Sequence, residues 1–108
     1  MELLKDKVAL VTGGGSGIGR SVAELYARNG ASVIVSDIDD RGGQAVVEEI
    51  KHAGGKAFFV KADVSKAADN EQLVAATIKE YGKLDIACNN AGIGGESAPT
   101  GNYKLTIY

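Results

Sequence analysis

The feature that most constrains the fold of this chain is the regular alternation of short apolar runs with longer segments of helical periodicity. Four runs rich in apolar and β-branched residues predict buried strands, and they lie at residues 7–12, 32–36, 56–61 and 84–89. A helical crossover returns the chain to the same end of the sheet, so strands joined in this way run parallel. We therefore expect an α/β fold with a doubly wound parallel sheet, truncated after about four strands.

The three segments between these runs predict amphipathic helices that cover the sheet. Their apolar side chains recur at intervals of three or four residues, which places them on one face of a helix. Asp39 or Asp40 is suited to cap the second helix, because a carboxylate accepts a hydrogen bond from the first turn. The expected inward stripes are Ile18, Val22, Leu25 and Tyr26; Val46, Ile50 and Ala53; and Val74, Ile78 and Tyr81.

Composition narrows the class of protein. The 108 residues are 44% hydrophobic and carry 12 Lys and Arg against 14 Asp and Glu, a balance that argues against a disordered tail or a basic nucleic-acid-binding module. No apolar run approaches the roughly 18 residues of a membrane span, and residues 1–6 do not resemble a signal peptide. We therefore expect a cytoplasmic protein that contacts neither nucleic acid nor membrane.

Glycines cluster at the turn between the first strand and the first helix. Gly13, Gly17 and Gly19 lie where the backbone must turn tightly, and the absence of side chains lets a pyrophosphate approach the N–H groups at the helix N-terminus. No lysine follows the last glycine, which disfavours the P-loop of kinases and GTPases. The turn therefore predicts a phosphate site of another kind.

Asp37 identifies the nucleotide that suits this turn. It ends the second strand of the βαβ unit, at about the offset expected of a carboxylate that accepts ribose hydroxyls. A carboxylate there would repel the 2′-phosphate of NADP, and the following Ile38 brings no positive charge to offset the repulsion. We therefore expect NAD as the cofactor.

Four motifs together resemble the short-chain dehydrogenase/reductase family. They are the T-G-x-x-x-G-[IL]-G pattern of residues 12–19, Asp37, Asp63-Val64 and the N-N-A-G run of residues 89–92. The resemblance covers about residues 5–95 and implies a Rossmann fold, with residues 1–95 as an NAD-binding half-domain and 96–108 as a loop-rich tail. It implies cofactor-binding roles for Gly13, Ser16, Gly17, Ile18, Gly19, Asp37, Asp63, Val64, Asn90, Ala91 and Gly92. Among these, Asp63 and Val64 would contact adenine, and residues 90–92 would support both the sheet and the cofactor.

The chain departs from the family at the reaction centre. Family members use a Ser and a Tyr-x-x-x-Lys pair from later elements, and no tyrosine of this sequence has a lysine four residues on. We assign no catalytic residue, and we expect tail or surface roles for Ser97, Tyr103 and Tyr108. Two interpretations stay open: the cofactor-binding half of an NAD-dependent oxidoreductase, and a non-catalytic NAD-binding module. The N-N-A-G run disfavours a third, an S-adenosylmethionine methyltransferase.

The remaining candidate residues favour structural roles. Cys88 lies in a predicted strand without a basic neighbour, and His52 suits the negative end of a helix. The acidic residues 37, 39 and 40 have ribose and capping roles, so we propose no metal site. Leu105 and Ile107 alternate with polar residues and allow a short edge strand, although chain ends are more often frayed. We expect the fourth strand to present an unpaired edge and to promote homo-oligomers.

Overall fold

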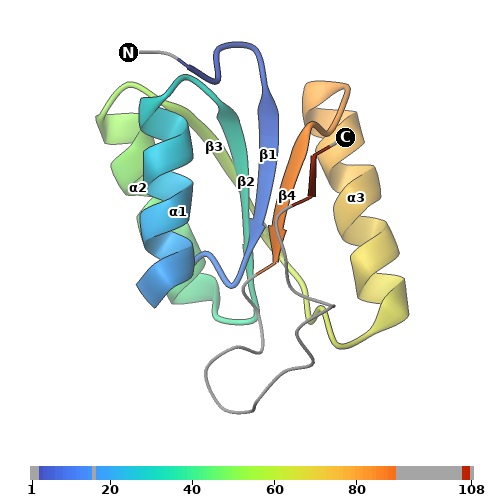
Figure 1. The fold of residues 1–108 in the computed structure, drawn as a ribbon. Coiled ribbons are helices and arrows are strands. Elements are labelled where there is room, and N and C mark those ends of the chain that lie inside the picture. Colours follow the sequence, from blue (N-terminus) through green and yellow to red (C-terminus); the bar gives the residue numbers. More distant parts are fainter. Residues whose placement is uncertain (1–2, 16, 90–105, 108) are drawn as a thin grey trace.

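The computed structural model describes residues 3–15, 17–89 and 106–107 (Figure 1). Strands and helices alternate along the chain as expected for a βαβ architecture. The elements are β1 (Val8–Thr12), α1 (Gly17–Arg28), β2 (Ser32–Asp37), α2 (Asp40–His52), β3 (Lys56–Lys61), α3 (Ala67–Tyr81), β4 (Ile86–Asn89) and β5 (Thr106–Ile107). Asp39 caps α2: its side chain accepts a hydrogen bond from the Arg41 N–H, which confirms one of the two predicted caps.

The strands form one sheet in the order β3-β2-β1-β4-β5. The four strands β1 to β4 are parallel, which confirms the predicted α/β class, and β1 lies in the middle between β2 and β4. The short strand β5 pairs antiparallel with β4, through Ile86–Ile107 and Ala87–Thr106. The expected unpaired edge on the fourth strand is therefore wrong at Ile86 and Ala87, where the last residues of the described chain cover it.

Helices pack on both faces of the sheet, with α1 and α2 on one face and α3 on the other (Figure 1). Alternate residues of each strand point to opposite faces, so the core divides into two clusters. One contains Val11, Val33 and Val35 of the strands with Val46 and Ile50 of α2. The second is smaller, and is formed by Leu10, Ile34, Ala62 and Leu73. These two layers of helix confirm the doubly wound arrangement.

The predicted inward stripe of α2 is correct except at its end, whereas that of α3 is wrong by one position. Val46 and Ile50 are buried, and Ala53 is the exposed cap that follows the helix. In α3 the buried residues are Leu73 and Thr77. Val74 and Ile78, predicted to be core, are 42% and 44% exposed, and Tyr81 is half-buried.

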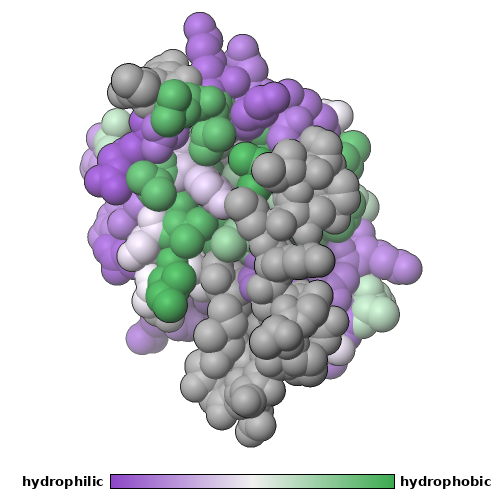
Figure 2. All heavy atoms as spheres, in the orientation of Figure 1, coloured by the Kyte–Doolittle hydropathy of each residue, from purple (hydrophilic) through white to green (hydrophobic). Residues whose placement is uncertain are grey.

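The predicted stripe of α1 is only partly buried. Gly19 and Ala23 lie against the sheet because small side chains let the helix approach closely, and Val22 and Tyr26 are half-buried. Ile18 is 67% exposed and Leu25 is also exposed. Apolar side chains therefore gather on the outer surface of α1, at the left of the space-filling view (Figure 2).

The two phenylalanines of β3 differ in burial, and charged side chains link α1 to α2. Phe59 is half-buried and packs against the first cluster, whereas Phe58, expected in the core, alternates with it along the strand and is exposed. On the outer side of the helices Arg20 forms ion pairs with Glu24 of α1 and Glu49 of α2. These exposed pairs link the two helices and add little stability, since solvent screens them.

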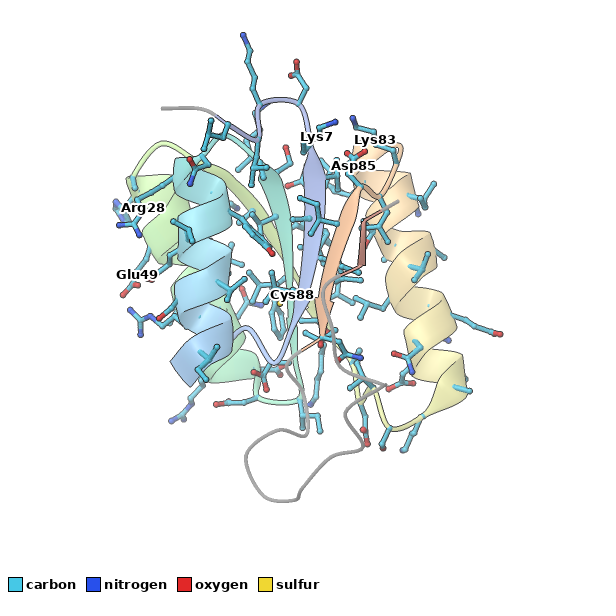
Figure 3. The ribbon with its side chains drawn as sticks, viewed as in Figure 1. Lys7, Arg28, Glu49, Lys83, Asp85 and Cys88 are labelled. Carbon is cyan, nitrogen blue, oxygen red and sulfur yellow. The ribbon has the colours of Figure 1, made fainter. Side chains whose placement is uncertain are left out.

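Asp85 holds β4 against β1 at the amino ends of both strands. Its Oδ2 accepts a hydrogen bond from the Val8 N–H at 2.8 Å, and its own N–H donates to the Val8 carbonyl at 2.9 Å. Lys83 Nζ lies 3.1 Å from the same carboxylate, and Figure 3 shows these groups together. The hydrogen bond from Val8 is the largest cause that lowers the pKa of Asp85, and the hydrogen bond and charge of Lys83 lower it further. Regular pairing of β4 starts at Ile86, directly after these bonds and two residues later than predicted.

Candidate functional site

The carboxyl ends of β2, β1 and β4 meet at one edge of the sheet and carry a row of polar side chains. Thr12 is paired in register with Ser36 on one side and with Asn89 on the other. Thr12 Oγ1 donates a hydrogen bond to Asn89 Oδ1 at 2.5 Å, which ties β1 to β4 where the strands end. Ser36 Oγ is buried, and no hydrogen-bond partner is found for it within the described part of the chain. In the sequence, each of these polar residues comes at the end of an apolar run. That pattern could have predicted the row, but the sequence analysis did not use it.

The glycine loop leaves β1 and returns directly into α1. The Gly14 N–H donates to the Ser36 carbonyl at 3.0 Å, so the loop begins by following the end of β2. At Gly19 a Cβ atom would lie 1.9 Å from the Gly13 carbonyl oxygen, and only a hydrogen leaves room for the first turn of α1 at this distance. Gly13 and Gly19 thus lie against each other at the start of α1.

Gly17 marks the open side of this loop. It is the first residue of α1 and has φ of 58°, a left-handed conformation that favours glycine. A Cβ atom built there meets nothing within 4 Å, and both Gly17 and Ile18 are exposed. The first N–H groups of a helix have no partner within the helix and carry partial positive charge. The loop therefore offers space and donors to an anion such as a pyrophosphate.

Asp37 ends β2 beside this loop, with its carboxylate held from two sides. Oδ2 accepts a hydrogen bond from the Gly15 N–H at 2.9 Å, and Oδ1 accepts one from the Asp39 N–H at 3.0 Å. A carboxylate offers about four acceptor positions, so two bonds leave capacity for further donors. The half-buried side chain is thus an oriented acceptor next to the anion site.

Asp63 and Val64 lie after β3, at the same edge of the sheet. The intervening Ala62 N–H donates to the Asp37 carbonyl at 3.2 Å, which ties this segment to the end of β2. Asp63 Oδ1 accepts bonds from the backbone and the hydroxyl of Ser65, and these bonds lower the pKa of Asp63. Val64 is half-buried against the second cluster, so its side chain has a packing role.

Four predicted site residues, Ser16, Asn90, Ala91 and Gly92, lie outside the described residues. Cys88, on β4 in Figure 3, is half-buried and packs against the first cluster. Burial raises the pKa of the Tyr26 hydroxyl, and the neighbouring Cys88 raises it further.

Among residues 3–15, 17–89 and 106–107, no group of three or more His, Cys, Asp or Glu is arranged to hold a metal ion. Within the same described ranges, every helix is too short or too polar to cross a membrane.

Comparison with known proteins adds an independent observation. A family model described as short chain dehydrogenase matches residues 7–106. Tropinone reductase-like 1 of Erythroxylum coca is 51% identical over 90 residues, which are 83% of this chain and 32% of that protein. Cyclohexanol dehydrogenase of Acinetobacter sp. (strain SE19) is 50% identical over 91 residues, 84% of this chain and 36% of that protein.

A solved structure agrees with the fold. The crystal structure of hydroxysteroid dehydrogenase from Escherichia coli superposes with a TM-score of 0.82 and 40% sequence identity, over 91% of this chain and 43% of that one. The chain therefore spans about a third of the length of the two curated relatives named here, and somewhat more of the solved structure.

Proposed function

Because the chain belongs to the short-chain dehydrogenase family, we propose that it binds NAD(H) between its glycine loop and Asp37. The family as a whole uses NAD or NADP, and the choice of NAD is our proposal. When bound, the nicotinamide supplies or accepts the hydride of an alcohol–ketone conversion. This chain contributes the groups that hold the cofactor and select it.

The orientation of Asp37 is the observation that supports this choice. Its two hydrogen bonds from backbone N–H groups hold the carboxylate beside the loop and leave acceptor positions for the 2′- and 3′-hydroxyls of an adenosine ribose. A 2′-phosphate in the same place would bring a second negative charge against a group that is already anionic. Asp37 therefore favours NAD through attraction and disfavours NADP through repulsion.

The other roles follow from position along the site. We assign the pyrophosphate to the loop residues Gly13, Ser16, Gly17, Ile18 and Gly19, since the open N-terminus of α1 supplies N–H donors there. We assign adenine to the segment Asp63–Val64, which the Ala62 bond holds beside the end of β2. Asn90, Ala91 and Gly92 follow β4 directly and are proposed to support the cofactor from the other side of β1.

The 108 residues alone are proposed to bind without turnover. Their sequence contains no Tyr-x-x-x-Lys pair, the feature that the family uses to move the substrate proton. Relatives named cyclohexanol dehydrogenase and hydroxysteroid dehydrogenase suggest a secondary alcohol or ketone for the complete enzyme. One alternative is a non-catalytic NAD-binding module. Turnover of alcohols by the isolated chain would contradict both.

Titration calorimetry with NAD and NADP tests the proposal. Asp37→Ala removes charge-assisted hydrogen bonds of about 1.5–3 kcal/mol, so NAD affinity is expected to fall roughly 10- to 150-fold. NADP affinity should stay equal or rise, because the repulsion disappears. Asp40→Ala is the matched control, since it removes an exposed acid three residues away whose carboxylate lies 3.9 Å from Lys61 Nζ. An NAD-to-NADP affinity ratio that Asp37→Ala leaves unchanged would refute the role of Asp37.

A further inference from the structure

Two consecutive glycines in the first turn of α2 require an explanation. Gly42 and Gly43 lie within the helix, although glycine lowers the stability of a helix interior relative to alanine. Neither has a left-handed φ, so backbone conformation is not the reason. Both are crowded by other parts of the fold, which points to close approach as the reason.

Gly42 is crowded by the glycine loop, and Gly43 is crowded by β3. A Cβ atom at Gly42 would lie 2.9 Å from the carbonyl oxygen of Gly15. At Gly43 a Cβ atom would lie 1.9 Å from Cε1 of Phe59, on the neighbouring strand β3. Seen from the loop, a Cβ atom at Gly15 would meet the Gly43 nitrogen at 2.9 Å and Asp37 Oδ2 at 2.8 Å. The missing side chains of Gly15 and Gly42 thus allow the backbones of loop and helix to touch, with the Asp37 carboxylate at the junction, and the missing side chain of Gly43 lets α2 approach the ring of Phe59.

The two bonds that orient Asp37 come from the two sides of this junction. Gly15 belongs to the loop, and Asp39 is the residue that caps α2. The bond from Asp39 is local, because Asp39 lies only two residues after Asp37, whereas the bond from Gly15 joins Asp37 to a loop 22 residues away and needs the loop to stay in its present place. The distance between α2 and the loop therefore affects the Gly15 bond, which is one of the two that orient the carboxylate.

We propose that Gly42 and Gly43 are positioning residues for Asp37, and that they maintain the preference for NAD over NADP. The proposal rests on the proposed function, since it concerns the same carboxylate. At Gly42 the atom that a Cβ would meet is backbone, which cannot rotate away as a side chain would. Alanine there moves the loop from the helix and loosens the Gly15 bond. The carboxylate then turns away from the ribose hydroxyls, while groups that bind the pyrophosphate are retained.

Titration of the 108-residue chain with NAD and NADP tests this inference. For Gly42→Ala we expect the Kd for NAD to rise about three- to tenfold and the Kd for NADP to change less than twofold. Gln44→Ala is the matched control, because Gln44 is exposed on the same helix two residues further on; it should change neither constant. In an Asp37→Ala background, Gly42→Ala should no longer alter the affinity ratio. Loss of folding alone would weaken both cofactors together and leave the ratio constant.

A second pair of variants covers the case in which Gly42→Ala does not fold. Gly43→Ala should shift the ratio in the same direction, and combining it with Phe59→Ala, which removes the opposing ring, should restore much of the wild-type ratio. If Asp37→Ala shifts the ratio while folded Gly42→Ala and Gly43→Ala do not, the inference is overturned and the proposed function stands. If Asp37→Ala itself leaves the ratio unchanged, or wild type binds neither cofactor, the proposed function fails and the inference fails with it.

Discussion

Gly19 and Gly17 belong to the same motif, yet the structure gives them different physical reasons to be glycine. Replacing Gly19 by alanine would place Cβ 1.9 Å from the Gly13 carbonyl oxygen and 2.7 Å from its carbon. Both are backbone atoms, so relief requires the loop to move away from α1. Replacing Gly17 by alanine meets no atom within 4 Å and only imposes the left-handed φ of 58° on a residue with a side chain.

The two costs differ in size. Overpacking costs about 1–3 kcal/mol, and contact with backbone favours the upper end. Alanine is the better helix former and stabilises the helix by about 1 kcal/mol relative to glycine, which offsets part of this cost. Gly19→Ala should therefore lower the free energy of unfolding by about 2 kcal/mol. Gly17→Ala should lose about 1 kcal/mol, the strain of a left-handed residue, because no overlap adds to it. In a domain of this size the Gly19 loss corresponds to a Tm decrease of roughly 10 °C.

Urea denaturation followed by circular dichroism measures these differences, and thermal melts give the matching Tm values. Ser21→Ala provides the control on α1, since Ser21 is exposed and its change should stay within about 0.5 kcal/mol. Cofactor titration separates the two sites further: Gly17→Ala should weaken binding more than its stability loss implies, because its methyl group enters the open side of the loop. A Gly19→Ala protein as stable as wild type would refute the close approach of α1 to Gly13.

Three further predictions concern residues that hold the sheet. Asp85→Asn should cost about 1–2 kcal/mol at pH 7. The Val8 bond lowers the folded pKa of Asp85, so this difference should be complete above the unfolded value of about 3.9 and vanish in urea titrations as pH falls through the folded pKa. Ser36→Ala should leave stability equal or raise it by up to about 1 kcal/mol, and a clear loss in Tm would show that the buried hydroxyl is paired. Leu73→Ala should cost about 2–5 kcal/mol and Val74→Ala about 0.5 kcal/mol or less; equal midpoints in chemical denaturation would contradict the observed orientation of α3.

The order of strands and helices was predictable because each level of the sequence agrees. Buried parallel strands are continuous apolar runs, and β1 is buried at every position as Val8–Thr12 predicts. Asp37 was predictable as well, since its place at the end of β2 follows from the strand boundary. Its contact with Gly15 confirms that it lies beside the loop, and its role toward a cofactor stays a prediction.

Helix orientation was harder to predict, because periodicity groups residues on a face without showing which face the sheet covers. In α3 both Leu73 and Val74 are apolar, and the sheet covers the first and not the second. In α1 the contact with the sheet is made by Gly19 and Ala23, whose small size is invisible to a search for large apolar side chains. The same limit hid Gly42 and Gly43, whose importance depends on the ring of Phe59, a neighbour from another element.

The central place of β1 has a consequence for synthesis. Its hydrogen bonds to β2 join neighbours in sequence, whereas the bonds from Val8 to Asp85 and from Thr12 to Asn89 each span 77 residues. A ribosome adds roughly 5–20 residues per second, so several seconds pass between the emergence of β2 and that of β4. Only then can β4 pair with β1. During that interval one side of the innermost strand has no partner strand, and such an unpaired edge is able to pair with another strand. The β1–β4 pairing at the centre of the sheet thus forms later than the β1–β2 pairing beside it.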